Sequence, residues 1–95
     1  METKIVWTLE AEEDFDAIII FLERQSPHYA NLWGDNLIEK LELLKQFPKM
    51  GRIVSEKEIS FIREIIIDDY RVIYAFINGV INILAIKHSA SLLRG

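Results

Sequence analysis

The chain has 95 residues and a mass of 11.1 kDa, the size of one small domain, so residues 1–95 are treated as a single domain. It has no cysteine, which excludes disulfides and thiolate chemistry. Its apolar runs are far shorter than the about 20 residues that a membrane span needs, so we expect a cytoplasmic protein without membrane contact. The net charge of −4 argues against indiscriminate nucleic-acid binding. The charge is uneven, with −6 over residues 1–47 and +2 over residues 48–95, which directs any anionic partner to the second half.

A short strand and a helix are predicted first. Ile5 to Trp7 are β-branched or aromatic, and Thr8 is a suitable helix N-cap. The helix that follows has an apolar face that Ile19 to Phe21 widen. Residues at helical spacing define this face: Ala11, Phe15, Ile18 and Leu22.

Ser26-Pro27 predicts the start of a second helix, because serine caps helices and proline is tolerated in their first turn. Phe47-Pro48 ends it. Two amphipathic helices with a short joint form an antiparallel helical hairpin. The apolar residues of the second helix again keep helical spacing: Ala30, Trp33, Leu37, Leu41 and Leu44.

The remainder of the chain predicts an antiparallel sheet. Lys49 to Ser60 forms a polar connection with at most a short strand around Ile53, and three strands follow between Ile59 and His88, separated by Asp68-Asp69 and Asn78-Gly79. The predicted class is therefore α+β, with an N-terminal strand, a helical hairpin and a three- to four-stranded antiparallel sheet packed on it.

Asn78-Gly79 predicts a type I′ turn, which places Tyr74 opposite Ile83. Alternation along the strands then assigns two faces. One face collects Tyr70, Val72, Tyr74, Phe76, Ile81, Ile83, Ala85 and Lys87. The other collects Arg71, Ile73, Ala75, Ile77, Val80, Asn82, Leu84 and Ile86. The helices can cover only one face, and the seven residues after His88 are too few to cover the other, so we expect it to be open to a second copy or a partner segment.

Strong enzyme motifs are absent from the sequence, and no metal or cofactor is expected. His88 is predicted to lie opposite Asp69, where a hydrogen-bonding role is favoured over acid-base catalysis. Arg63 and Arg71 need solvent, an acid or a ligand, and ion pairs with neighbouring carboxylates stay open beside anion binding. A two-residue Asp68-Asp69 turn would put these arginines on opposite faces, whereas one further residue would unite them in one patch.

The chain resembles the ParE/RelE superfamily of small bacterial toxins from type II toxin-antitoxin, or plasmid stabilisation, modules. The resemblance runs over most of the chain, and the order and spacing of its pieces make it specific. The pieces are Trp7-Thr8, Ser26-Pro27, Pro48 with Gly51-Arg52, Phe61-Ile62-Arg63-Glu64, Tyr70-Arg71-Val72-Ile73-Tyr74, and Ile83 to His88.

This resemblance implies a toxin that a cognate antitoxin keeps silent. RelE-like members cut messenger RNA on the ribosome with basic residues and a late tyrosine, whereas ParE-like members inhibit DNA gyrase. Here the lysine positions of the nuclease branch hold Ile62 and Glu64, and no tyrosine follows the last strand. The resemblance therefore favours a gyrase-binding ParE-like toxin without enzymatic activity. The alternatives are a RelE-like endoribonuclease using Arg63, Arg71 and His88, and a non-toxic binding relative.

Two sets of residues follow as candidate sites. A target or an anion is expected to meet the basic set: Arg52, Arg63, Arg71, Lys87 and His88. The antitoxin is expected to meet an apolar set on the open sheet face and the helices: Phe15, Ile19, Phe21, Trp33, Ile73, Leu84 and Ile86. A homodimer is a further possible use of the same surface.

Overall fold

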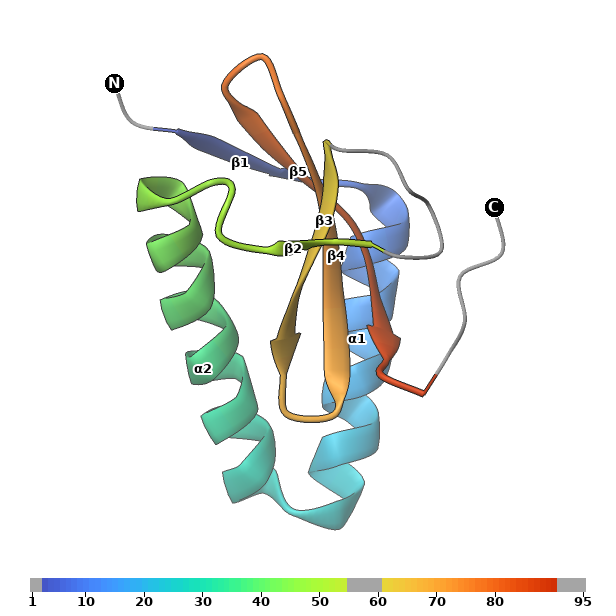
Figure 1. Ribbon diagram of the computed structural model, residues 1–95. Coiled ribbons are helices and arrows are strands. Elements are labelled where there is room, and N and C mark those ends of the chain that lie inside the picture. Colours follow the sequence, from blue (N-terminus) through green and yellow to red (C-terminus); the bar gives the residue numbers. More distant parts are fainter. Residues whose placement is uncertain (1–2, 55–60, 91–95) are drawn as a thin grey trace.

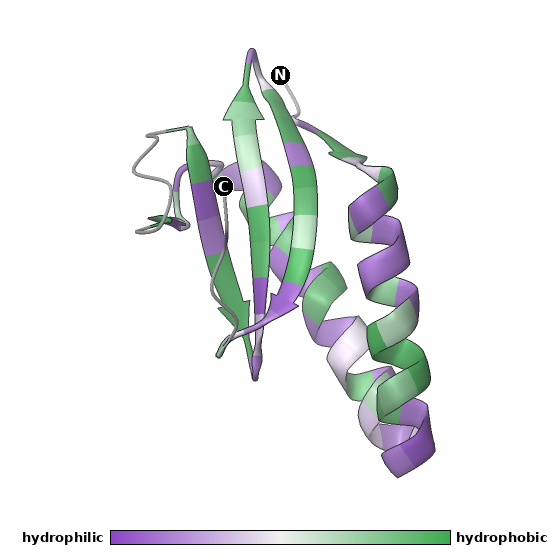
Figure 2. Ribbon diagram, turned by 90° about the vertical axis from the view of Figure 1, so that its right-hand side faces the viewer, coloured by the Kyte–Doolittle hydropathy of each residue, from purple (hydrophilic) through white to green (hydrophobic). Residues whose placement is uncertain are grey.

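The computed structural model describes residues 3–54 and 61–90; part of the predicted connection Lys49 to Ser60 and the end of the tail lie outside the described residues. The elements are β1 (Lys4–Trp7), α1 (Leu9–Gln25), α2 (Pro27–Gln46), β2 (Arg52–Ile53), β3 (Ile62–Ile67), β4 (Tyr70–Ile77) and β5 (Val80–His88). The described strands form a five-stranded sheet in the order β1-β5-β4-β3-β2, and both helices lie on one of its faces (Figures 1 and 2).

The predicted α+β class is confirmed, and the predicted N-terminal strand joins the sheet as one of its five described strands. β1 pairs parallel with β5, whereas β2, β3, β4 and β5 pair antiparallel with one another. The helices run in opposite directions and diverge from their short joint, as the predicted hairpin requires (Figure 1). Neither of these described helices is long and apolar enough to cross a membrane.

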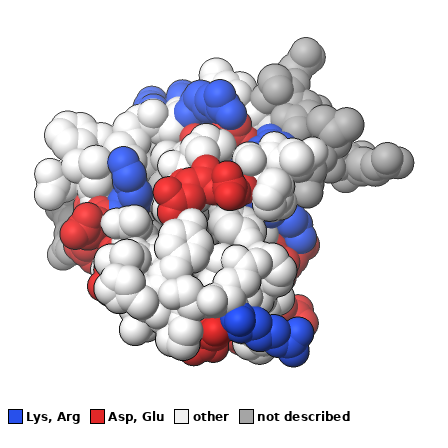
Figure 3. Space-filling view, turned by 90° about the horizontal axis from the view of Figure 1, so that it is seen from below, with Lys and Arg blue, Asp and Glu red and all other residues white. Residues whose placement is uncertain are grey.

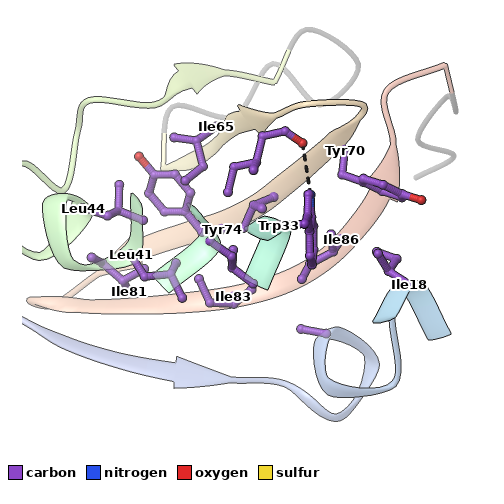
Figure 4. Packing of buried hydrophobic residues seen from close by; sticks show 14 of the residues in the cluster. Ile18, Trp33, Leu41, Leu44, Ile65, Tyr70, Tyr74, Ile81, Ile83 and Ile86 are labelled. Carbon is purple, nitrogen blue, oxygen red and sulfur yellow. Dashed lines mark hydrogen bonds between the residues drawn. The ribbon is translucent and has the colours of Figure 1, made fainter. Parts of the chain in front are cut away.

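The helix face of the sheet, which we define as the face that α1 and α2 cover, contains the main core (Figure 4). Trp33 is fully buried there, with its ring centroid 6.1 Å from that of Phe15 and 5.4 Å from that of Tyr70. Its Nε1 donates a hydrogen bond to the carbonyl of Ile67 at 3.4 Å. The predicted apolar positions of α2 are all buried: Ala30, Trp33, Leu37, Leu41 and Leu44.

A β-bulge in β5 changes which of its side chains face the helices. The predicted turn and the pairing of Tyr74 with Ile83 are confirmed, since both turn residues have positive φ. Beyond this pair the register shifts by one residue, and Val72 lies opposite Ile86 instead of the predicted Ala85. The predicted faces are therefore wrong for the end of β5, because Ile86 joins the helix-face core and Ala85 lies on the other face.

Thr8 connects this bulge to the start of α1. Its hydroxyl caps the helix by accepting from the Ala11 N–H at 3.1 Å, as predicted, and donates to the carbonyl of Leu84 at 3.0 Å. Its N–H donates to the carbonyl of Ile83 at 3.0 Å. Thr8, the N-cap of α1, thus satisfies two backbone carbonyls of the β-bulge in β5.

Asp14 of α1 protects the part of β5 that lacks a neighbouring strand. β1 pairs with β5 only as far as Ile83, so the later residues form a sheet edge. One Asp14 carboxylate oxygen accepts from the N–H of Ile86 at 2.9 Å, and the other accepts from Lys87 Nζ at 3.2 Å. A side chain thereby takes the place of a strand at an edge that would otherwise invite pairing.

The outer face, opposite the helices, is not open in the way the sequence predicted. Val54, which follows β2, packs with Ile73 and Ala85, and all three are buried. β2 itself is the edge strand of the sheet and pairs with β3. Large apolar side chains that stay exposed on this face are Val6, Ile66 and Ile77. The expectation of a bare sheet face is therefore wrong at this cluster, because Val54 packs against Ile73 and Ala85 there.

Candidate functional site

Three of the motif residues that carry the family resemblance, Arg52, Glu64 and Arg71, meet in one hydrogen-bonded cluster. Glu64 of β3 is at its centre, with a side chain that is 4% exposed. One carboxylate oxygen accepts from Arg71 Nε at 2.7 Å, and the other accepts from Arg52 Nε at 2.6 Å. We call Arg52, Glu64 and Arg71 the ionic cluster. The Arg71 side chain is 6% exposed and that of Arg52 is 69% exposed, so only Arg52 offers much of its guanidinium to a partner.

The turn between α2 and β2 is held by side chains from β3 and β4. Arg63 Nη1 donates to the carbonyls of Gly51 at 2.8 Å and Lys49 at 3.3 Å. The Tyr74 hydroxyl donates to the carbonyl of Pro48 at 2.7 Å and accepts from the Gly51 N–H at 3.0 Å. Burial raises the pKa of Tyr74, against the opposing effects of the Gly51 N–H and the Arg63 charge.

Gly51 is required by this close contact. A Cβ at this position would lie 2.6 Å from the Tyr74 hydroxyl oxygen and 2.7 Å from the carbonyl oxygen of Glu64. Neither atom can retreat easily, since one is hydrogen-bonded and the other belongs to the backbone of a paired strand. The Pro-x-x-Gly-Arg series is thus explained by packing and hydrogen bonding of the turn.

Arg63 and Arg71 lie on opposite faces of the sheet. The Asp68-Asp69 turn contains two residues, because Ile67 pairs directly with Tyr70. Arg63 is then opposite Tyr74 on the helix face, and Arg71 is opposite Ile66 on the outer face. Of the two arrangements that the sequence left open, the one with separate arginines is therefore present, and a single patch containing both is excluded. The predicted ion pair is found for Arg71, whereas Arg63 binds backbone carbonyls.

Lys87 and His88 also have partners within the fold. Lys87 Nζ lies 3.2 Å from carboxylate oxygens of both Glu10 and Asp14. Burial works against its charge, but these two carboxylates outweigh burial and raise the pKa of Lys87. The His88 ring contacts Tyr70 edge to face at 5.7 Å, and its Nδ1 accepts from the Ala90 N–H at 3.1 Å.

The expected position of Asp69 opposite His88 is wrong, because the register shift places Tyr70 there. His88 therefore has an aromatic neighbour in place of the carboxylate that the sequence suggested. This leaves the three residues of the nuclease hypothesis apart: one binds a turn on the helix face, one binds Glu64 on the outer face, and one contacts Tyr70 at the end of β5.

The residues expected to meet an antitoxin are divided between core and surface. Trp33, Ile73 and Ile86 are buried, so they do not reach the surface. Phe15, Ile19 and Leu84 are half-buried, whereas Phe21 is exposed. The sheet part of the expected surface is thus largely occupied by the chain's own packing, and the helical part is accessible.

A groove between the diverging helices lies in this accessible part. It has a volume of about 350 Å³ and is lined mainly by apolar side chains, with two carboxylates. Its lining is Trp7, Glu12, Phe15, Asp16, Leu37, Ile38 and Leu41. Sequence reasoning missed Ile38, which is 62% exposed, because it lies outside the apolar stripe of α2; an isolated isoleucine on a polar helix face is the signal that could have found it.

The end of the molecule where the helices join has a different character. Figure 3 shows acidic and basic side chains interspersed there around broad uncharged areas. In this view the described surface has no continuous basic patch. The helical end therefore lacks the field that steers a polyanion to a protein.

Comparisons with known proteins agree with this architecture. The model of the family described as "ParE toxin of type II toxin-antitoxin system, parDE" matches residues 5–93. "Toxin RelE2" of Caulobacter vibrioides is 28% identical over 90 residues, which cover 94% of this chain and 98% of that protein. A chain from the structure "Chromosomal ParDE TA system from P. aeruginosa" shares the fold, with a TM-score of 0.73 and 21% identity over 90% of this chain and 95% of the other.

These findings place the chain among the toxins of type II toxin-antitoxin modules, whose partner is an antitoxin. The match extends over nearly the whole sequence. The chain belongs to the ParE toxin family.

Proposed function

We propose that this toxin acts in the cytoplasm by binding and inhibiting DNA gyrase, and that its antitoxin neutralises it by occupying the groove between α1 and α2. The observation that carries the first part is the separation of the candidate nuclease groups. Cleavage of RNA needs a base, an acid and a positive charge around one phosphate. Arg63 and Arg71 lie on opposite faces of the sheet and are each bound within the fold, which favours inhibition by binding.

The groove suits an amphipathic segment of an antitoxin. Its lining is mainly apolar, and an apolar helix or extended segment would remove Phe15 and Ile38 from water. Glu12 and Asp16 also line it, so a lysine or arginine of the antitoxin would find a carboxylate there. The outer sheet face is less suited, because part of it is already covered.

A supercoiling assay with purified, antitoxin-free toxin and reconstituted DNA gyrase tests the target. We expect inhibition that rises with toxin concentration and is relieved by added antitoxin. A contrary result would be unaffected supercoiling together with cleavage of messenger RNA on programmed ribosomes. If that cleavage were abolished by Arg71→Ala in a folded protein, the endoribonuclease hypothesis would replace ours.

The same assay tests the groove. Ile38→Ser should raise the antitoxin concentration needed to restore supercoiling by tenfold or more, because it removes an exposed apolar contact at the groove. Leu9→Ser is the matched control, since Leu9 is 73% exposed and does not line the groove. An equal antitoxin requirement for the two variants would place the antitoxin elsewhere.

A further inference from the structure

The end of the molecule where α2 finishes contains two adjoining hollows. One has a volume of about 560 Å³ and the other about 270 Å³, and both are lined by Lys49 and Phe76. The larger is otherwise lined mainly by the α2–β2 turn, and the smaller also by Phe61 and Arg63. We call this surface the aromatic end and define it as Phe47, Lys49, Met50, Phe61, Arg63 and Phe76.

Large apolar side chains of this surface are exposed to water. Phe47 is 57% exposed, Phe61 is 46% exposed and Met50 is 38% exposed. They come from two segments that are apart in the sequence, and Phe76 of a third segment lines both hollows. A grouping of exposed phenylalanines around hollows is typical of a protein-binding surface.

The turn that carries Phe47 to Met50 is already fixed in place. Arg63 binds the carbonyls of Lys49 and Gly51, and Tyr74 binds the carbonyl of Pro48. The N–H of Met50 donates to the carbonyl of Phe47 at 3.0 Å. A partner that binds here would therefore have little backbone to order, which lowers the entropic cost of association.

The charge of the aromatic end opposes that of the molecule. The charged residues that line the two hollows are Lys49 and Arg63, and no described carboxylate lines either of them. On a chain with a net charge of −4, this local excess of positive charge favours an acidic partner. Two cations are too few for the multiple phosphate contacts of nucleic-acid binding, so the arrangement favours an acidic segment of a protein.

From these observations we infer that the aromatic end docks an acidic, apolar segment of the toxin's target protein, while the helical groove serves the antitoxin. This inference rests on the proposed function, because it assigns the surface that contacts the target. It divides the toxin into two surfaces at different places on the fold, one for action and one for neutralisation.

The test uses the full chain with the double substitution Phe47→Ser and Lys49→Glu. Both side chains are exposed, and the contacts that hold the turn are made by backbone carbonyls, so the fold should persist in circular dichroism and thermal unfolding. The matched control is Leu9→Ser with Lys4→Glu, which makes the same kind of change at exposed positions away from both hollows. Gyrase inhibition and growth arrest on expression are measured for all three proteins.

We expect the double variant to need at least tenfold more protein for half-inhibition and to lose growth arrest, while the control behaves like the wild type. A folded double variant with wild-type potency would overturn the docking surface alone. If the wild type arrests growth without affecting gyrase and the double variant does not arrest growth, the surface stands and the gyrase assignment falls. A wild type with neither effect would overturn the toxin proposal and this surface with it.

Two further measurements test whether a nucleic acid or a second copy of the chain binds the aromatic end instead. Fluorescence anisotropy with a single-stranded oligonucleotide at physiological salt should show no binding that depends on Lys49. Light scattering should show the same mass for the wild type and the double variant. Binding of the oligonucleotide that the substitutions abolish, or a dimer that they dissociate, would overturn the inference in favour of a nucleic acid or a second copy.

Discussion

The helix face and the outer face of the sheet are closed by different means. Sixteen described buried residues from both helices and three strands pack on the helix face, with Trp33 and Tyr74 among its fully buried side chains. On the outer face, a cluster of three buried residues lies beside the ionic cluster around Glu64. The first face is stabilised by removal of apolar surface from water, and the second by charged groups that satisfy one another.

The difference shows why arginines in the family motifs need not be catalytic. Arg71 stands in a strand whose neighbours are buried, and its guanidinium is expensive to bury without an acid. Glu64 supplies that acid across the β3–β4 pair and also binds Arg52 of the next strand. One carboxylate thus connects three strands on the face that has the smaller apolar cluster.

The largest expected effect is on the helix face. Trp33→Ala should lower the free energy of unfolding by about 3–5 kcal/mol, because it leaves a cavity at the centre of the aromatic contacts with Phe15 and Tyr70. Urea denaturation measures this loss. Trp7→Ala, at a half-buried position, is the control and should cost less. Equal losses would contradict the central place of Trp33 in the core.

A smaller effect is expected when the ionic cluster is broken. Glu64→Gln should lower the free energy of unfolding by about 3 kcal/mol, since the buried Arg71 guanidinium loses this carboxylate. Arg52→Ala should cost less than about 1 kcal/mol, because its side chain is mostly exposed. The comparison separates the buried half of the cluster from the exposed half. Similar losses for both variants would show that the outer face depends on Arg52 as much as on Arg71.

The smallest effect concerns alkaline pH and involves Tyr74 on the helix face and Lys87 where β5 meets α1. The pKa of Tyr74 is raised by burial, and Glu10 and Asp14 raise that of Lys87. In both cases the folded protein holds its proton to higher pH than the unfolded chain, so this stability is fully present below the ordinary values of 10.0 and 10.5 and is lost as pH rises further. Urea unfolding at several pH values from 9 to 11 should show falling stability.

Two substitutions separate the contributions of Tyr74 and Lys87 to the loss of stability at alkaline pH. Tyr74→Phe should remove the part that arises on the helix face, and Lys87→Gln the part that arises where β5 meets α1. Each variant should show a shallower fall in stability with rising pH than the wild type. An unchanged slope in either variant would remove its residue from the explanation.

Much of the fold could be predicted, because its signals are local. Thr8 and Ser26 cap their helices as expected, and both accept from backbone amides three residues further along. The Asn78-Gly79 turn and the apolar stripes were also found from spacing alone. In each case one short stretch of sequence contains the whole physical reason. A side-chain oxygen binds a free backbone amide at the start of a helix, and the two turn residues can adopt the positive φ that the turn needs.

The errors arose where contacts join distant parts of the chain. The bulge at Leu84 is stabilised by Thr8, 76 residues away, and alternation along β5 gives no sign of it. The covering of the outer face depends on Val54, a single valine after a two-residue strand. For the site, the sequence could suggest that Arg71 meets a carboxylate, but not that Arg63 binds carbonyls of the turn that Gly51 ends.

The extra residue in β5 decides which side chains beyond Ile83 meet the helices. If the strand kept regular alternation through Leu84, Ile86 would turn away from the helices and Ala85 would lie beneath them, so that a methyl group would fill the place of an isoleucine. Asp14 would lose the amide that it binds. Homologues that lack the bulge should therefore carry their large apolar residue two positions after the equivalent of Ile83, where this chain carries it three positions after.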